Sequence, residues 1–160
     1  MASDIFTKLG DIKGESPDDK HKGEIELLSW SWGVQQSGTM AHGGGGGEGK
    51  ASFHDFSFSH YIDKSSPVLL KACATGEHIK DGIITVRKAG KGQQEFLIIK
   101  FNDILITSVN PTATGNGGGT AENVALQCSK VDLEYKPQKP DGSLDAGVHF
   151  KYDIKANKEG

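Results

Sequence analysis

The stretch Lys22-Gly23-Glu24-Ile25-Glu26-Leu27-Leu28-Ser29-Trp30-Ser31-Trp32-Gly33 contains both tryptophans of the chain. From Leu28 to Val34 every second residue is apolar, which is the period of a β-strand with one apolar face. This alternation predicts a long strand on which both indole rings point to the same, buried side. We therefore expect Trp30 and Trp32 to be core or subunit-contact residues. The alternative is an exposed stacking platform for sugars or bases.

The apolar residues change parity within three predicted strands. The changes fall near Leu27, between Phe53 and Phe56, and between Cys128 and Val131. An extra residue in a strand produces such a change, because a β-bulge bends the strand and reverses the side on which later residues lie. Bent, twisted strands allow a sheet to curl on itself. The sequence thus predicts a mainly β protein, built as an antiparallel β-barrel or closed sandwich.

The last predicted strand has the clearest alternation, with Val148, Phe150, Tyr152 and Ile154 separated by polar residues. Alternation of this kind indicates a strand with one buried face. We expect Phe150 and Tyr152 to be core residues on that face.

One segment, 66–76, has the pattern of a helix. Ser66 suits the N-cap, a proline follows at the first helical position, and Gly76 marks the end. Its narrow apolar stripe of Leu69, Leu70 and Cys73 would lie against the wall of the barrel, which places Leu69 and Cys73 in the core. A single short helix on the side of the sheet is therefore predicted.

Glycine is abundant, with 22 residues among 160, and it concentrates at 43–49 and 115–119. Neither cluster has side chains that could build a core. Both are expected to be loops, the first a long hairpin excursion from Gln35 to Lys50.

Length and charge limit the classes of protein that fit. A chain of 160 residues is the size of one domain, so residues 1–160 are expected to form a single unit. The net charge of −3 offers no basic field for nucleic acid or anionic lipid. No apolar run approaches the roughly 20 residues that cross a bilayer. The first residues, Met1 to Ile5, lack the features of a signal peptide, so synthesis and folding in the cytoplasm are expected.

Candidate chemical motifs are weak. Gly44 to Lys50 has the spacing of a phosphate-binding loop, but Ala51 replaces the hydroxyl residue that would bind magnesium, and a strand pattern follows. On one strand His54 and His60 would lie roughly 20 Å apart, too far to share one ion. Cys73 falls mid-helix, where a thiolate gains no stabilisation. The residues predict no catalytic group, metal or cofactor, and favour a structural or interaction protein over an enzyme. A monomeric small-ligand-binding β-barrel remains the alternative.

Short motifs spread over nearly the whole chain closely resemble those of the Hcp (haemolysin-coregulated protein) family. They are the tryptophan stretch quoted above, Asp4-Ile5-Phe6, Ile12-Lys13-Gly14-Glu15-Ser16, His21-Lys22-Gly23-Glu24, Ser66-Pro67 with Ala72-Cys73 and Gly76, Val86-Arg87-Lys88-Ala89-Gly90, Thr107-Ser108-Val109, Glu122-Asn123-Val124, and Tyr135-Lys136-Pro137-Gln138-Lys139 with Asp141-Gly142-Ser143. The chain departs from the resemblance at Lys151-Tyr152, where many family members have glycine-tryptophan.

The resemblance implies a role in bacterial type VI secretion. Such proteins form homohexameric rings that stack into a tube inside a contractile sheath, leave with a VgrG-type spike at the tip, and carry small effectors in the lumen. It implies cytoplasmic synthesis followed by secretion without a cleaved signal peptide. It also implies that residues 36–49 reach the adjacent ring, with Thr39, Met40, His42, Glu48 and Lys50 as candidate stacking contacts. A secreted enzyme fused to this fold would need sequence beyond Gly160.

Overall fold

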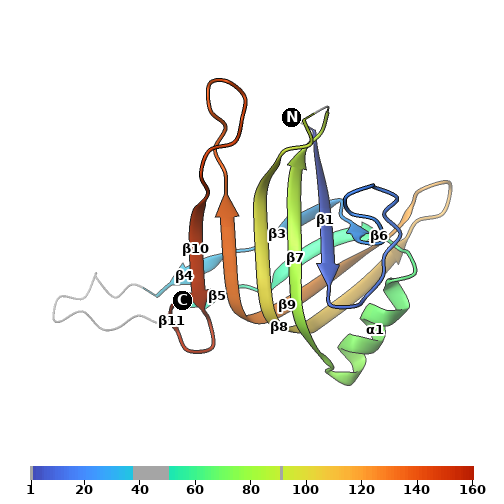
Figure 1. The fold of residues 1–160 in the computed structure, drawn as a ribbon. Coiled ribbons are helices and arrows are strands. Elements are labelled where there is room, and N and C mark those ends of the chain that lie inside the picture. The colour runs from blue at the N-terminus through green and yellow to red at the C-terminus, as the bar shows by residue number, and fades with distance from the viewer. Residues whose placement is uncertain (1, 38–50, 91) are drawn as a thin grey trace.

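The computed structural model describes residues 2–37, 51–90 and 92–160. This part of the chain is mainly β, with antiparallel strands and one α-helix (Figure 1). The elements in chain order are β1 Ser3–Leu9, β2 Ile25–Glu26, β3 Ser29–Ser31, β4 Val34–Gln36, β5 Ala51–Phe53, β6 Phe56–Tyr61, α1 Ser66–Thr75, β7 His78–Lys88, β8 Glu95–Ala113, β9 Thr120–Tyr135, β10 Val148–Asp153 and β11 Lys158–Glu159.

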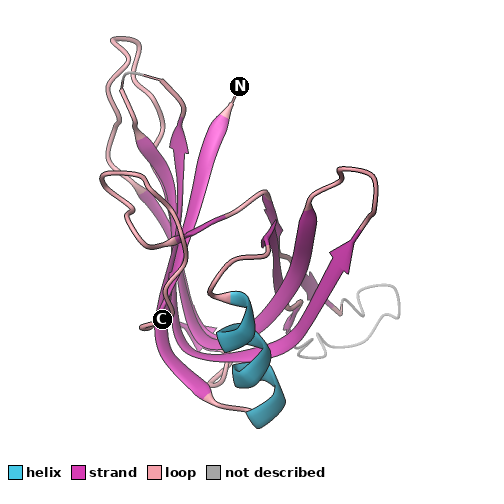
Figure 2. Cartoon of the chain, turned by 90° about the vertical axis from the view of Figure 1, so that its right-hand side faces the viewer, coloured by secondary structure: helices cyan, strands magenta, loops and turns pink. Residues whose placement is uncertain are grey.

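The strands form two facing layers that share the long strands β8 and β9 (Figure 2). Strand β9 pairs with β8 on one side. On its other side, its second half pairs with β10 and its first half pairs with β6. The first layer continues from β8 through β7 and β1 to β2, and the second ends at β3, which pairs with β6. The predicted antiparallel sandwich is confirmed, and the described strands do not close into a barrel.

The layers join where β8 and β9 bend together. Asp103 has φ +55°, and its carboxylate accepts a hydrogen bond of 2.7 Å from the Ser129 hydroxyl on β9. The buried positions of β8 change parity across this point, from Phe101 to Ile104. Pairing keeps the same register on both sides, so the parity change predicted in β9 is a coordinated bend and not an inserted residue. A register shift does occur in β8, between Ile106 and Ser108.

The other two parity changes mark places where the chain passes from one partner to another. The Leu27 amide donates to Ile5 on β1, whereas the Leu28 amide donates to Ser59 on β6. In the same way, β5 pairs with β4, whereas β6 pairs with β3 and β9. The predicted long strand is therefore wrong in its extent, because it consists of the three short strands β2, β3 and β4.

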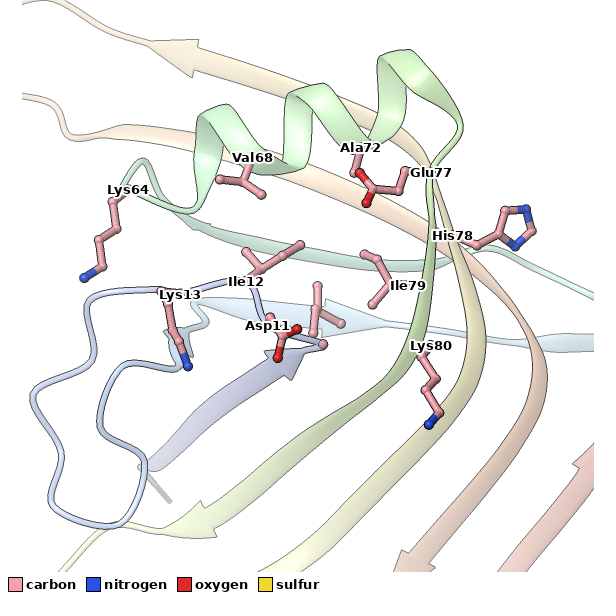
Figure 3. A pocket seen from close by; sticks show the side chains of 12 residues that line it. Asp11, Ile12, Lys13, Lys64, Val68, Ala72, Glu77, His78, Ile79 and Lys80 are labelled. Carbon is pink, nitrogen blue, oxygen red and sulfur yellow. The ribbon is translucent and has the colours of Figure 1, made fainter.

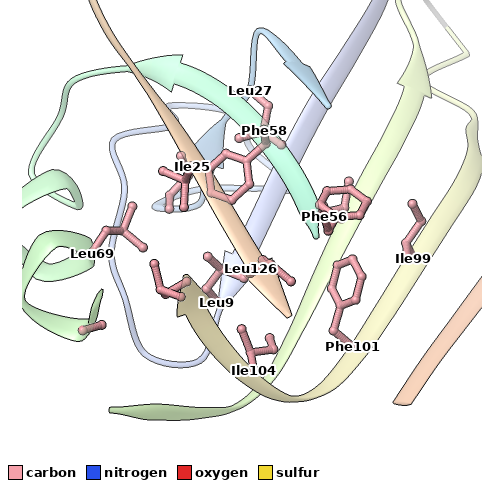
Figure 4. Packing of buried hydrophobic residues seen from close by; sticks show 14 of the residues in the cluster. Leu9, Ile25, Leu27, Phe56, Phe58, Leu69, Ile99, Phe101, Ile104 and Leu126 are labelled. Carbon is pink, nitrogen blue, oxygen red and sulfur yellow. The ribbon is translucent and has the colours of Figure 1, made fainter. Parts of the chain in front are cut away.

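The core lies between the layers and is built by side chains from most of the long strands (Figure 4). Phe56 is at its centre, with Trp30 stacked on it at 5.4 Å between ring centroids and Phe101 edge-on at 5.0 Å. Each large side chain removed from water here stabilises the fold by about 1.5–3 kcal/mol. The fully buried apolar side chains include Leu9, Ile25, Phe56, Leu69, Ile84, Ile99, Phe101, Ile104, Ile106 and Leu126.

Helix α1 covers one end of the sandwich (Figure 1). It begins one residue earlier than predicted, because Ser65 is the N-cap, and the Ser66 hydroxyl accepts the Asp63 amide instead. Gly76 ends the helix at φ +69°, a conformation that glycine adopts without steric cost. Leu69 is fully buried, but Leu70 is 43% exposed, so the apolar stripe is narrower than expected.

Candidate assembly surface

A chain of aromatic rings runs from the core to the surface beside β10. Trp32 lies 5.7 Å from Phe53 and 6.3 Å from Phe150, measured between ring centroids. Tyr152 closes the group at 5.1 Å from Phe53 and stacks on Phe150 at 6.0 Å. These rings attach the β4–β5 hairpin to β10. Trp32 is half-buried, as is Trp30, and both pack against the core without being enclosed by it.

The outer end of this aromatic chain is open. We call the residues there the β10 patch: Val34 (51% exposed), Tyr135 (47%), Val148 (67%) and Phe150 (39%). The expectation that Phe150 is a core residue is therefore wrong for the single chain, because on this side only Trp32 and the β4–β5 hairpin face it and they leave the ring 39% exposed. Tyr152, farther along the strand, is half-buried and does pack against the core.

Strand β10 is also an edge. Its outer side pairs with β11 at Tyr152 and Asp153, and the Lys151 carbonyl accepts the Gly160 amide at 3.2 Å. The backbone of 148–150 has no strand partner on that side among the described residues. An exposed edge with apolar side chains is a template for pairing with another chain. The β10 patch thus combines free backbone groups with unburied apolar area.

A second exposed apolar surface lies on the other side of the molecule, where Figure 1 shows α1 and the end of β6. We call these exposed residues the helix-side patch: Leu28, Tyr61 and Ile62, which share one hollow, together with Val68 and Leu70 on two different sides of α1, each at least 40% exposed. Three of these residues line a hollow of about 350 Å³ that also contains Glu15, Glu26 and Asp63. This hollow has apolar and acidic side chains and no basic one among its lining residues.

A groove of about 550 Å³ lies next to this patch, between α1 and the loop that follows β1 (Figure 3). Val68 and Ala72 line it from the helix, and Ile12 and Ile79 line it from the opposite side. Charged side chains surround this apolar floor: Asp11, Lys13, Lys64, Glu77 and Lys80. The groove suits an apolar side chain of a partner, and its mixed rim offers contacts to both signs of charge.

The described residues contain no cluster of three or more histidine, cysteine or acidic side chains with the geometry of a metal site. His60 is fully buried, and its Nε2 lies 2.7 Å from the Glu122 carboxylate on β9. Sequence reasoning missed this pair, although His60 shares the parity of the buried Phe56 and Phe58.

Burial raises the pKa of the Cys128 thiol to about 12, which keeps it protonated and unreactive. Cys73 is half-buried on α1 and packs against the core.

The predicted stacking contacts Thr39, Met40, His42, Glu48 and Lys50 lie outside the described residues. The strands that flank them are described, and they pair antiparallel from Val34↔Phe53 to Gln36↔Ala51. Residues 36 and 51, which flank the segment, therefore lie opposite each other on paired strands, next to the aromatic rings of Trp32 and Phe53. None of the helices in the described ranges has the length and hydropathy of a membrane span.

The fold is an antiparallel β-sandwich with an open strand edge and two separate exposed apolar surfaces. Exposed apolar surfaces of this kind are typical of proteins that associate with other protein chains. A family model described as type VI secretion system effector, Hcp, matches residues 6–135. The chain belongs to the Hcp family of type VI secretion proteins.

Individual relatives agree with this assignment. The chain is 47% identical to protein hcp1 of Pseudomonas aeruginosa, over 98% of each chain. It superimposes on the crystal structure of Hcp1 from Salmonella typhimurium with a TM-score of 0.80 at 40% identity, covering 99% of both chains. A solved structure of a type six secretion system protein gives a TM-score of 0.92 at 28% identity, covering 99% of this chain and 100% of the other.

Proposed function

We propose that this protein is the tube subunit of a type VI secretion system. In this proposal it forms homohexameric rings that stack into a tube, the contractile sheath expels the tube with a VgrG-type spike at its tip, and small effectors travel in the lumen. The observation that carries it is the pair of unlike apolar patches on opposite sides of the molecule. Two different surfaces that bind each other produce a head-to-tail contact, which closes into a ring or continues as a filament.

The charges of the two patches support such a contact. Acidic Glu15, Glu26 and Asp63 line the hollow of the helix-side patch. Lys151 is exposed on the face of β10 opposite Phe150, beside the free edge of the strand, and Lys155 is exposed just beyond the strand. Opposite charges on two meeting surfaces fix their register and disfavour like-with-like pairing. A permanent ring needs an interface of roughly 2,000 Å² or more, which a strand edge with flanking side chains can supply and a glycine loop cannot.

Stacking of one ring on the next is assigned to residues 36–49. The glycines of this segment permit backbone conformations closed to other residues, which suits a contact that must tolerate different relative positions of two rings. Thr39, Met40, His42, Glu48 and Lys50 are the proposed contact side chains. The protein is further proposed to be made in the cytoplasm, to leave with its N-terminus uncleaved, and to act without catalysis or a cofactor.

The first experiment is the mass of the purified protein by sedimentation velocity, with electron microscopy of concentrated samples. A ring gives six times 17.1 kDa, whereas the alternative of a monomeric ligand-binding β-barrel gives 17.1 kDa. Deletion of Gly43 to Gly47 should leave the hexamer intact and abolish tubes and secretion, since loop length changes closure entropy only weakly.

Gly115→Ala, in the other glycine loop, is the control and should leave tubes unchanged, because no other part of the described structure lies within 4 Å of the added methyl group. A monomeric wild-type protein would refute the ring. If the protein without Gly43 to Gly47 is monomeric while the control still forms rings, residues 43–47 contribute to ring closure and not only to stacking. A shortened N-terminus on the secreted protein, or secretion without the sheath, would refute the proposed route.

A further inference from the structure

The segment 10–24, between β1 and β2, folds back on itself and contributes to both surface hollows beside α1. The Gly14 amide donates to the Gly23 carbonyl at 2.8 Å, and the Ser16 amide donates to the Glu24 carbonyl at 3.0 Å. Ile12 and Lys13 line the groove next to the helix, and Glu15 lines the acidic hollow. The Glu15 carboxylate also accepts the Lys64 amide at 2.8 Å, just before α1. The position of this segment therefore sets the shape of the helix-side surface.

His21 fixes the segment to the sheet through three contacts. Its ring stacks on Phe6 of β1 at 4.5 Å between centroids, and the residue is 7% exposed. Its Nδ1 lies 2.7 Å from the Glu24 carboxylate, and its Nε2 lies 2.8 Å from the Glu95 carboxylate on β8. A carboxylate only accepts hydrogen bonds, and a neutral imidazole has only one N–H. The imidazolium alone can donate to both glutamates.

Further charged groups surround this contact. The Arg87 guanidinium on β7 lies 4.8 Å from the centre of the Phe6 ring and donates to Asp18 and to Asp4. The Asp18 carboxylate in turn accepts the His21 amide at 3.1 Å. The groups that face His21, directly or through Phe6, are thus four carboxylates, of Asp4, Asp18, Glu24 and Glu95, and one permanent cation, Arg87.

The Arg87–Asp18 pair differs from His21 in its response to pH. Its hydrogen bonds hold the pKa of Asp18 at about 2 and raise the pKa of Arg87. Both groups therefore stay charged throughout the neutral and mildly acidic range, and this pair anchors the middle of the segment at every pH in that range. Histidine is the side chain whose charge ordinarily changes there, with a free value of about 6.5.

We propose that His21 is a proton-dependent latch, which holds segment 10–24 against the sheet when the imidazole is doubly protonated and releases it when one proton is lost. After that loss, a nitrogen lone pair faces one carboxylate, and a charge-assisted hydrogen bond becomes a repulsive contact. Because the protonated form is the one that the fold binds, the latch is closed at low pH and opens as the pH rises. The Arg87–Asp18 anchor keeps the opening local, so the groove and the acidic hollow change shape while the sandwich stays folded.

The test is hydrogen–deuterium exchange of peptides covering residues 10–24, corrected for the intrinsic pH dependence of exchange. Protection of these peptides should fall about tenfold between about pH 5.5 and pH 8.5, since one charge-assisted hydrogen bond shifts a local equilibrium by at least that factor. Peptides of β8 and β9 should keep their protection. Equal protection of 10–24 at both pH values would overturn the latch.

Two variants separate the latch from general packing. His21→Gln should give low protection of 10–24 that does not respond to pH. The control His149→Gln should behave like the wild type in these peptides, because the His149 ring also lies between two carboxylates, at 2.9 Å from Asp132 and 3.1 Å from Glu134, but is on β10. Glu95→Gln keeps an acceptor but removes a negative charge, so the loss of protection should begin at lower pH. Glu95 is partly exposed, and this variant keeps the test available if His21→Gln does not fold. An unshifted transition in Glu95→Gln would contradict the proposal.

Discussion

Phe56 and Phe150 come from strands with the same alternating pattern, yet one is 1% exposed and the other 39% exposed. Phe56 lies where β6 is faced by the opposite layer, and its ring contacts Trp30 and Phe101. Phe150 lies on the edge strand β10, where the facing layer is reduced to the β4–β5 hairpin and Trp32. Strand period tells which residues share a side, but it does not tell whether that side is covered. The covered region folds the chain, and the uncovered region is available for a partner.

The largest effect should come from the covered region. Phe56→Ala removes a fully buried ring and should lower the free energy of unfolding by about 3–5 kcal/mol. Urea denaturation followed by circular dichroism measures this change. A loss below about 1 kcal/mol, the size of an ordinary substitution, would show that the core around Phe56 is not the main source of stability.

The tryptophan between the two regions should give an intermediate effect. Trp30 stacks on Phe56 but is only half-buried, so Trp30→Ala should cost about 2–3 kcal/mol, less than the ~3–5 expected for an enclosed ring. The same denaturation experiment compares it directly with Phe56→Ala. A cost near zero would restore the interpretation of Trp30 as an exposed stacking platform.

The ion pair between Arg87 on β7 and Asp18 should make a contribution to the free energy of unfolding that depends on pH. The pKa of Asp18 is lowered from 3.8 to about 2, chiefly by hydrogen bonds from Arg87, so the fold prefers its ionised form. The contribution is therefore complete above the unfolded value and is lost as the pH falls towards about 2. Asp18→Asn should be less stable than the wild type at neutral pH, and the difference should shrink in acid. A difference in the free energy of unfolding between the two proteins that stays constant from neutral pH into acid would contradict this.

The smallest effect on folding and the clearest effect on assembly are expected at the uncovered region. Val148→Ser should change the free energy of unfolding of the subunit by no more than about 0.5 kcal/mol, as for other exposed positions. It should nevertheless shift the proposed rings towards monomers, because polar substitution removes apolar area from the β10 patch. Sedimentation velocity at several concentrations measures this, with Lys139→Ser on an exposed turn as the control. A strongly destabilised subunit would mean that Val148 is part of the core after all.

Much of the fold could be predicted from the sequence because its signals are local. The alternation in 148–154 identified a strand, and Gly76 identified the end of α1. Leu69 is buried as its helical position suggested. The family followed from motifs spread along the chain, and the comparisons confirm it. The stacking residues in 36–49 stay a prediction.

The sequence by itself determined the strand type of the long segments, the position of the helix and the family, since each depends on residues close together in the chain. Tertiary structure decided what covers each apolar face. It divided the tryptophan stretch among two layers at Leu27, left Phe150 open, and buried His60 opposite Glu122. It also placed His21 between Glu24 and Glu95, residues 71 positions apart. Such contacts depend on which strands become neighbours, and periodicity within one strand contains no information about the strand that will face it.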